Sequence, residues 1–234
     1  MKIYAVKIEQ VEEKLFDRML LYVSKEEQER IRRYRKYEDA IRGLTARLLL
    51  RYIIASLLGI DNRSISLNQN KYGKPFLEEV EDFQFNLSHS GDWVVCAVDS
   101  LPIGIDVEKI HDVNLDLSER FFSQEEHNWL LTMDVERRMD SFFKLWTLKE
   151  SYIKAEGKGL SIPLNTFSFS FEGEKVLFKA KDDLEQWYFK QYEIDLYYKL
   201  AVCSKKDHFP ERVNCLSFDE LVNLAKNHLK ELDY

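Results

Sequence analysis

Two acidic residues interrupt an otherwise apolar segment in the middle of this chain. The segment is Pro102–Glu108, with the sequence PIGIDVE, and it carries Asp106 and Glu108 two positions apart. Residues i and i+2 of a strand point to the same face, so the two carboxylates are expected side by side near the core. Buried carboxylates normally protonate, pair with a cation or coordinate a metal ion, because burying one unpaired is costly. The fold must therefore bring a cation to this strand.

A third acid is expected on the apolar stripe of a helix. Apolar residues recur at helical spacing over residues 139–153, and Glu150 falls on that stripe, with Lys154 one turn beyond it. Three converging carboxylates suit a hard cation such as Mg²⁺. The alternative is that Asp106 and Glu108 pair with Lys or Arg at a sheet edge, while Glu150 only forms an i,i+4 pair with Lys154.

The composition is that of an ordinary globular protein. The chain has 234 residues, of which 45% are hydrophobic and 32% charged, which is enough for a sizeable core in one or two domains. Residues 1–8 alternate like a strand rather than a signal peptide, and no apolar run approaches the ~18 residues of a membrane span. Cys96, Cys203 and Cys215 show no zinc-ligand spacing. We expect a cytoplasmic protein that does not enter membranes.

The charge distribution is uneven along the chain. A net charge of -7 argues against generic nucleic-acid binding, which needs clustered cations. Only two acids, Glu38 and Asp39, lie between residues 30 and 51, among eight basic residues that could receive phosphates: Arg30, Arg32, Arg33, Arg35, Lys36, Arg42, Arg47 and Arg51. Alternatively, such basic residues often only form a solvent-exposed surface or pair with acidic residues.

The order of expected elements indicates two similar halves. Helices are expected over 24–36, where Ser24 and Glu27 form a capping box, and over 39–58. Strands are expected around 65–67, 83–87, 93–98 and 103–108, the last two joined as a hairpin. The second half repeats this order, with helices over 118–131, 140–156 and 218–232 and strands near 166–171, 175–179, 186–194 and 199–203. This order predicts an α+β fold, divided into residues 1–105 and 106–234. The acidic pair would lie where the halves meet, a place that ligand sites favour.

Five motifs in order resemble those of a known family. They are YGKP at Tyr72–Pro75, FNLSHS at Phe85–Ser90, GIDVE at Gly104–Glu108, RFFS at Arg120–Ser123, and WTLKESYIK at Trp146–Lys154 with GKGL after it. The set resembles the 4′-phosphopantetheinyl transferases of the surfactin type, which are found with bacterial nonribosomal peptide synthetases in antibiotic biosynthesis. The match covers nearly the whole chain.

The resemblance implies a pseudo-twofold α+β monomer that is a magnesium-dependent transferase. Such enzymes move the 4′-phosphopantetheine arm of coenzyme A onto a serine hydroxyl of apo acyl or peptidyl carrier proteins, and release adenosine 3′,5′-bisphosphate. The family's Mg²⁺ ligands correspond to Asp106, Glu108 and Glu150. Its coenzyme A contacts correspond to Arg42, Lys74, Ser88, His89 and Lys154.

The resemblance and the chemistry together suggest catalytic roles. Lys154 is expected to stabilise or protonate the leaving phosphate oxygen, one turn from Glu150. The serine proton needs a base, and the candidates are Glu150, Glu126 or a metal-bound water. Ser123 and Glu126 also form a capping-box pattern, which would explain Glu126 as a helix-start residue.

Two other functions fit part of the pattern. Asp-x-Glu with a distant Glu and Lys could serve a metal-dependent nuclease, although the acidic net charge disfavours it. A non-catalytic protein that binds carrier proteins would share the partner without the chemistry. Of these three functions, only the transferase predicts that the mass of the carrier protein increases.

Overall fold

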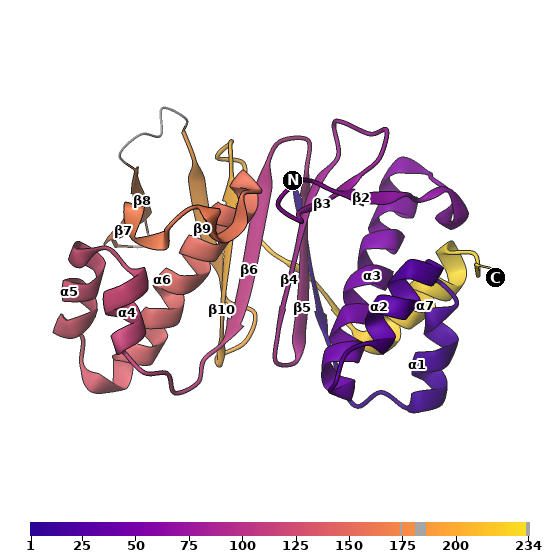
Figure 1. Ribbon diagram of the computed structural model, residues 1–234, viewed down its shortest axis with the longest axis horizontal. Helices are drawn as coiled ribbons and strands as arrows, with labels where there is room; N and C mark the ends of the chain where they lie inside the picture. The colour runs from indigo at the N-terminus through magenta and orange to yellow at the C-terminus, as the bar shows by residue number, and fades with distance from the viewer. Residues whose placement is uncertain (174, 181–185, 233–234) are drawn as a thin grey trace.

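Two β-sheets meet at the centre of the molecule, and helices cover the outer face of each sheet (Figure 1). The computed structural model describes residues 1–173, 175–180 and 186–232. One cluster of buried apolar side chains lies under each set of helices, and a third lies between the two sheets. Helices packed on largely antiparallel sheets define an α+β protein, so the predicted fold class is confirmed.

The N-terminal half is built on a sheet with the strand order β11-β1-β5-β4. Its neighbouring strands are antiparallel except β1 and β11, which are parallel. A two-stranded hairpin, β2–β3, leads from the long helix into β4. The elements are β1 (Lys2–Lys7), α1 (Glu13–Leu20), α2 (Lys25–Arg32), α3 (Tyr37–Leu58), η1 (Asn62–Ser64), β2 (Leu67–Gln69), β3 (Pro75–Leu77), β4 (Gln84–Ser90) and β5 (Trp93–Asp99).

The C-terminal half is built on a second sheet, with the order β6-β10-β9. The hairpin β7–β8 lies beyond it, and α6 packs over β6 and β10 (Figure 1). The elements are β6 (Ile103–Lys109), α4 (Asp116–Phe121), α5 (Gln124–Thr132), α6 (Val135–Glu156), η2 (Gly159–Ser161), η3 (Leu164–Thr166), β7 (Phe167–Glu172), β8 (Lys175–Ala180), β9 (Tyr188–Tyr192) and β10 (Tyr198–Ser204).

The two halves repeat one order of elements. Each has a strand, two short helices, a helix of 22 residues, a two-stranded hairpin and two further strands. Both long helices end at a left-handed glycine, Gly59 with φ 68° and Gly157 with φ 69°, a conformation that other residues adopt only with strain. Both α2 and α5 begin with a capping box. This repetition supports the predicted pseudo-twofold arrangement.

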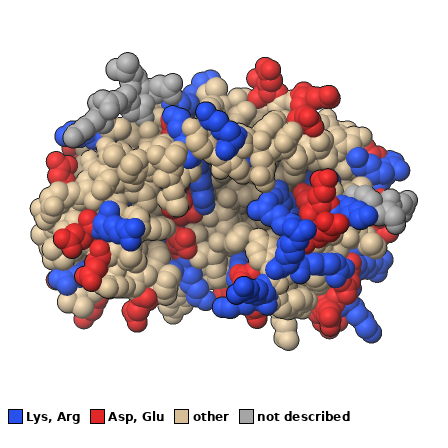
Figure 2. Space-filling model, viewed as in Figure 1, with Lys and Arg blue, Asp and Glu red and all other residues tan. Residues whose placement is uncertain are grey.

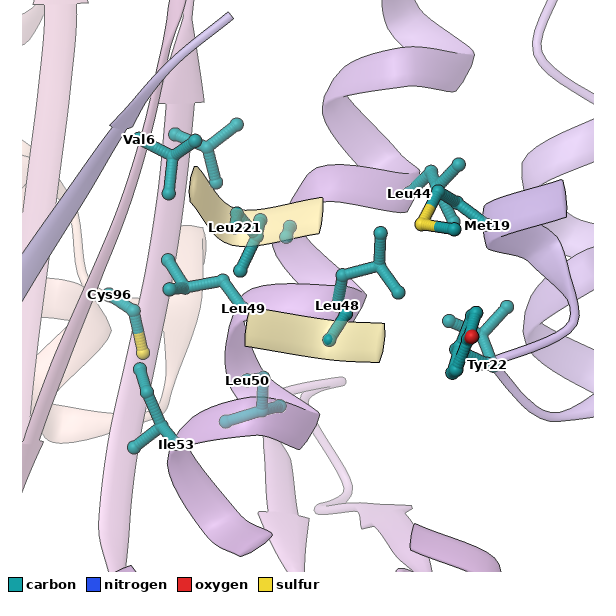
Figure 3. Close-up of a cluster of buried hydrophobic side chains, with 14 of the residues drawn as sticks. Val6, Met19, Tyr22, Leu44, Leu48, Leu49, Leu50, Ile53, Cys96 and Leu221 are labelled. Atoms are coloured by element: carbon teal, nitrogen blue, oxygen red, sulfur yellow. The ribbon is translucent and has the colours of Figure 1, made fainter. Parts of the chain in front are cut away.

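The end of the chain returns to the N-terminal half. β11 (Asn214–Ser217) pairs with β1, and α7 (Phe218–His228) packs against α3 (Figure 1). Figure 3 shows Leu221 of α7 near Leu49 of α3, with Val6 and Cys96 of the sheet nearby. The long helix α3 is therefore apolar on several faces, because the sheet covers one side and α1 and α7 cover others. The sequence did not predict this return, nor helix α1.

The chain crosses from one sheet to the other between β5 and β6. The predicted hairpin of 93–98 with 103–108 is wrong, because β5 pairs with β1 and β4 while β6 pairs with β10. The reason is the apolar face of β6, where Ile103, Ile105 and Val107 pack in the cluster between the sheets with residues of β5. Packing the two sheets face to face buries this apolar surface of β6. Pairing β5 and β6 edge to edge in one sheet would leave it exposed.

A predicted helix over 118–131 is divided in two. α4 ends at Phe121, and the buried Phe122 is extended before Ser123 caps α5. The capping box thus starts a new helix rather than lying within one. In the described part of the chain, no helix has both the length and the apolar character needed to cross a bilayer.

The facing edges of the two sheets, β4 and β6, are joined through side chains. Asn86 Oδ1 accepts a hydrogen bond from the Ile105 N–H at 2.9 Å, and Ser90 Oγ accepts one from the Lys109 N–H at 3.1 Å. Buried backbone N–H groups require partners, and here polar side chains of β4 take the place of strand carbonyls. The sheets therefore connect without a continuous ladder of backbone hydrogen bonds in the described residues.

Gly104 allows β6 to lie against α6. A Cβ atom at this position would be 1.9 Å from the Ser151 carbonyl oxygen and 2.5 Å from the Ala155 nitrogen, both backbone atoms of α6. The next residues on the same face of β6 are Asp106 and Glu108. The close approach at Gly104 therefore sets how near those carboxylates lie to α6.

We expect Gly104→Ala to lower the free energy of unfolding by roughly 3 kcal/mol, because helix and strand must separate to admit the methyl group. Chemical denaturation measures the loss. Gly59→Ala is the control: its added Cβ meets nothing within 4 Å, so only backbone strain of about 1 kcal/mol is expected. Equal losses in the two variants would contradict this account of the packing.

Candidate active site

A cavity of about 460 Å³ lies between the two halves. Helices α2 and α3 and strand β4 contribute its N-terminal wall, and β6 and α6 contribute its C-terminal wall. Its size is in the range of small-molecule sites, and charged groups of both signs line it. The lining residues that the following paragraphs use are Glu27, Arg30, Arg47, Ser88, His89, Asp106, Glu108, Glu150 and Lys154.

Asp106 is the most deeply buried of these acids, with 2% of its surface exposed. Its Oδ1 accepts hydrogen bonds from Lys154 Nζ at 2.6 Å and from Ser88 Oγ at 2.9 Å. Its Oδ2 is buried and has no hydrogen-bond partner. Burial raises the pKa of Asp106, although the Lys154 ammonium opposes that rise. Lys154 and Ser88 thus satisfy Oδ1, whereas Oδ2 could accept a contact from a further positive group.

Glu108 and Glu150 lie beside Asp106 and share its surroundings. Glu108 follows on the same face of β6, as the i,i+2 spacing predicts, and its Oε2 accepts a hydrogen bond from Ser90 Oγ at 2.8 Å. Burial, and then the charge of Asp106, raise the pKa of Glu108. Burial, and then Asp106, raise the pKa of Glu150 to about 7. The three carboxylates therefore repel one another, and an added cation would stabilise their charged forms.

Lys154 supplies the cation that the buried strand acid requires. It extends from α6, and its Nζ donates to Asp106 Oδ1 and to Ser88 Oγ, the latter at 3.0 Å. The simpler sequence-based alternative paired Lys154 with Glu150, one turn earlier, and assigned Asp106 to a cation at a sheet edge. The structure instead pairs Lys154 with Asp106, across the contact between helix and strand.

The donor set suits a divalent cation, although it is not a closed metal site. Within residues 1–173, 175–180 and 186–232, no three His, Cys, Asp or Glu side chains are close enough together to hold a metal ion as they stand. The unpartnered Asp106 Oδ2 and the two raised carboxylate pKa values nevertheless indicate unbalanced negative charge. All-oxygen ligands of this kind fit Mg²⁺, which also keeps water and substrate oxygens as ligands.

Of the other predicted coenzyme A contacts, Ser88 and His89 line the cavity, whereas Arg42 and Lys74 do not. Partial burial in the cleft, and then the nearby Arg42, lower the pKa of His89. Arg42 instead donates to the Gly91 carbonyl at 2.8 Å and pairs with Asp39 at 2.5 Å. These contacts hold α3 against the turn between β4 and β5.

Lys74 lies behind the cavity, where it caps the end of α6. Its Nζ donates to the carbonyl oxygens of Ile103 and Ala155, each at 3.1 Å. Asn70 of the same turn donates to the Gly157 carbonyl at 2.9 Å. The last carbonyls of a helix lack partners within it and favour a nearby cation, so this turn of the N-terminal half completes α6. Burial lowers the pKa of Lys74 to about 8.

Glu126 is separated from the three acids of the cavity. It is 1% exposed, and its Oε2 pairs with Lys149 Nζ at 2.7 Å while accepting the Ser123 N–H of the capping box. Its Oε1 accepts the Phe169 N–H at 2.8 Å. Both oxygens are thus committed to holding α5, α6 and β7 together.

The N-terminal half contains the counterpart of this ion pair. Glu27 occupies the same capping-box position in α2 and pairs with Arg51 at 2.7 Å. Arg51 and Lys149 stand at the same place in the two 22-residue helices. The Glu126–Lys149 pair is therefore one of two equivalent ion pairs, each of which joins a short helix to a 22-residue helix.

Sequence reasoning did not assign Tyr34 or Gly43 to the cavity, and it left Arg47 within a general basic run. All three line the N-terminal wall. The surplus of basic residues between 30 and 51 was the available signal. It could not separate the arginines that face the cavity from those that face solvent.

A second cavity, of about 590 Å³, lies between α5 and the hairpin β7–β8. Aromatic side chains dominate it, including Trp129 and Phe171, whose ring centroids are 5.3 Å apart. The carboxylates of the first cavity are absent from its lining among the described residues, so the catalytic candidates belong to the first.

Comparison with known proteins identifies the family. Residues 10–101 match the family model described as 4′-phosphopantetheinyl transferase, N-terminal, and residues 102–203 match that of the 4′-phosphopantetheinyl transferase superfamily. The 4′-phosphopantetheinyl transferase Sfp of Bacillus subtilis (strain 168) is 40% identical over 224 residues, covering 95% of this chain and 100% of that protein. The 4′-phosphopantetheinyl transferase psf-1 of Bacillus pumilus is 36% identical, covering 97% of this chain and 100% of that protein. This chain therefore belongs to the 4′-phosphopantetheinyl transferase superfamily and resembles its Sfp-like members.

Proposed function

We propose that this chain transfers the 4′-phosphopantetheine group of coenzyme A to a serine hydroxyl of apo carrier proteins, with Mg²⁺ bound by Asp106, Glu108 and Glu150. One observation carries the proposal beyond family membership. A nearly fully buried carboxylate, Asp106, has one oxygen paired with Lys154 and the other unpartnered, in a cavity between the two halves. A diphosphate and these acids would repel one another, so a divalent cation is required between them. When bound, Mg²⁺ neutralises charge on the diphosphate.

Ser88, His89 and Lys154 are assigned to the coenzyme A phosphates. Ser88 and Lys154 already form hydrogen bonds to one another and to Asp106, so their positions are fixed before substrate enters. Prior orientation of this kind lowers the cost of reaching the transition state. Lys154 donates to the oxygen on which charge develops as the bond within the diphosphate breaks.

Glu150 is assigned as the group that takes the serine proton. The serine oxygen forms a bond to the β-phosphorus, the bond to the adenosine bisphosphate oxygen breaks, and the proton passes to the Glu150 carboxylate. Glu150 lines the cavity and makes no hydrogen bond to the other described residues. Glu126, the other candidate side chain, does not line it and has both oxygens engaged.

The native partner belongs to the same proposal. The family's substrates are carrier proteins, and surfactin-type members act broadly on peptidyl and acyl carrier domains, so we assign such domains as acceptors. A monomeric state and a cytosolic location remain predictions from the sequence. Sedimentation analysis measures the first of these directly.

The decisive assay is intact-mass spectrometry of a purified apo carrier domain incubated with this protein, coenzyme A and Mg²⁺. We expect a gain of about 340 Da, the mass of the transferred group. Removal of Mg²⁺ with a chelator should abolish the gain. Asp106→Asn should also abolish it, because the buried oxygen can no longer carry charge.

Two competing functions give other results in that assay. A protein that only binds carriers would leave the mass unchanged and would still bind the carrier after Asp106→Ala. A metal-dependent nuclease would cleave DNA or RNA when Mg²⁺ is added and would not modify the carrier. Either outcome contradicts the transferase.

We expect Glu150→Gln to reduce turnover by about 100-fold or more while the protein stays folded, because a proton acceptor is lost. Stability should be unchanged or slightly higher, since removing one charge relieves repulsion from Asp106 and Glu108. Glu136→Gln, at an exposed position in the first turn of the same helix, is the control and should behave as wild type. Normal turnover in Glu150→Gln would exclude both roles assigned to this residue.

We expect Glu126→Ala to destabilise the protein by about 3–5 kcal/mol, because Lys149 is left as an uncompensated buried charge. Combining Glu126→Gln with Lys149→Met removes both charges, so the loss in the double variant should be less than the sum of the single losses. Thermal denaturation measures these changes. If the folded double variant lost turnover by about 100-fold, Glu126 would belong to the chemistry after all.

A further inference from the structure

We propose that Ser90, the last residue of β4, is a positioning residue for Glu108 and thereby sets the affinity of the site for Mg²⁺. The inference rests on the proposed function, because it takes Glu108 as a ligand of the metal ion. The resemblance assigned Ser88 and His89 of the same motif to coenzyme A and gave Ser90 no role. Glu108 lines the cavity and Ser90 does not, so Ser90 acts on the site through Glu108.

The hydroxyl proton of Ser90 is directed at Glu108. Ser90 Oγ accepts the Lys109 N–H at 3.1 Å and donates to Glu108 Oε2 at 2.8 Å. A serine hydroxyl has one proton to donate, and a backbone N–H can only donate, so that proton is left for the carboxylate. The two bonds tie the end of β4, in the N-terminal half, to the end of β6, in the C-terminal half.

Ser88 and Ser90 hold the two acids of β6 in the same way. Ser88 Oγ donates to Asp106 Oδ1 at 2.9 Å, two residues before the Ser90 contact on each strand. Side chains on one face of a strand repeat every two residues, so the spacing of the two hydroxyls matches that of the two carboxylates. Ser88 also contacts Lys154 and lines the cavity. The contact with Glu108 is what remains for Ser90 to provide.

Ser90 orients Glu108 without neutralising it. Lys199 lies directly opposite Glu108 on β10, and residues opposite one another in an antiparallel pair share a face of the sheet. Its Nζ nevertheless pairs with Asp140 of α6, at 2.6 Å. Lys and Arg side chains gather instead on the part of the N-terminal half that carries α2 (Figure 2). A cation bound to Glu108 would compete with Mg²⁺, whereas a neutral hydroxyl leaves the charge of the carboxylate available.

Glu108 needs such a partner because its side chain is long and flexible. Fixing a glutamate side chain costs rotamer entropy, and a hydrogen bond formed before the ion arrives offsets part of that cost. Ser90 occupies Oε2, and Oε1 has no hydrogen bond to any described residue, so Oε1 is left for the ion. Partners that orient metal ligands in this way typically change metal affinity by about 10–100-fold when they are removed.

The turn that follows Ser90 is fixed from both halves. Gly91 has a left-handed φ of 55°, and a Cβ atom there would lie 2.2 Å from the Tyr198 hydroxyl of β10. That hydroxyl accepts the Asp92 N–H at 2.9 Å, and Arg42 of α3 donates to the Gly91 carbonyl at 2.8 Å. The end of β4 is therefore anchored on two sides, which lets its last side chain hold Glu108 in one position.

The test compares the Mg²⁺ dependence of Ser90→Ala with that of wild type. We expect the Mg²⁺ concentration for half-maximal turnover to rise by about tenfold or more. At saturating Mg²⁺, kcat and the KM for coenzyme A should each stay within about threefold of wild type, because the site itself is intact. Electron paramagnetic resonance of Mn²⁺ bound to the protein with coenzyme A, without a carrier, should show a similar loss of affinity and needs no turnover.

Three further variants show whether the lost hydroxyl is the cause. Ser66→Ala is the matched control, because Ser66 Oγ donates to Glu78 Oε2 at 2.7 Å at an exposed place outside the cavity, and its Mg²⁺ dependence should equal that of wild type. Ser90→Thr keeps a hydroxyl and should stay within about threefold of wild type. Adding Ser90→Ala to Glu108→Gln should change the Mg²⁺ dependence by less than about twofold, because residues that act through one contact are not additive.

The outcomes distinguish this inference from the proposed function. If Ser90→Ala keeps the wild-type Mg²⁺ dependence and Mn²⁺ affinity, Ser90 does not position Glu108, although the protein remains a transferase. If it raises the KM for coenzyme A at saturating Mg²⁺, Ser90 acts on the substrate and the inference also fails. If wild type neither binds Mn²⁺ with coenzyme A nor modifies a carrier, the proposed function fails with it.

Discussion

Asp106 links the two halves through one buried carboxylate. Its Oδ1 receives Lys154 from α6 and Ser88 from β4, so the strand, the helix and the opposite sheet meet at one buried charge. Desolvation of that charge is costly, and the arrangement is stable only because a cation and a hydroxyl balance it. The other oxygen stays unpartnered. The same burial that requires Lys154 thus leaves the second oxygen of this carboxylate without a partner, and this is the basis of the Mg²⁺ site that we propose.

The repeated halves show which residues support the fold and which perform the chemistry. Glu27–Arg51 and Glu126–Lys149 occupy equivalent places, so these pairs belong to the fold. The acids do not repeat: Tyr4 and Val6 of β1 pack on the apolar core, on the face that corresponds to Asp106 and Glu108 of β6. One copy of the unit therefore carries the acids, and the other supplies β4 and the two arginines that line the cavity, Arg30 and Arg47. The site exists only where the two copies meet.

The sequence predicted the features that local geometry determines. Strand alternation placed Asp106 and Glu108 on one face, and helical spacing turned Glu150 inward. Patterns could not show which distant partner satisfies a polar group. Lys74 was predicted to bind coenzyme A, yet its neighbours are the Ile103 and Ala155 carbonyls, and Arg42 is held by Gly91. β11 escaped prediction because its partner, β1, lies at the other end of the chain. The predicted hairpin failed because apolar faces, rather than strand edges, decide how β5 and β6 pack.

The most direct test of the account is a crystal structure of the protein with coenzyme A and Mn²⁺, whose anomalous scattering locates the ion. The account predicts one anomalous peak, within about 2.3 Å of carboxylate oxygens from β6 and α6 and of diphosphate oxygens, with Lys154 beside the phosphates. A structure in which ordered coenzyme A occupies the cavity without an ion, or in which the ion binds away from Asp106, would contradict it.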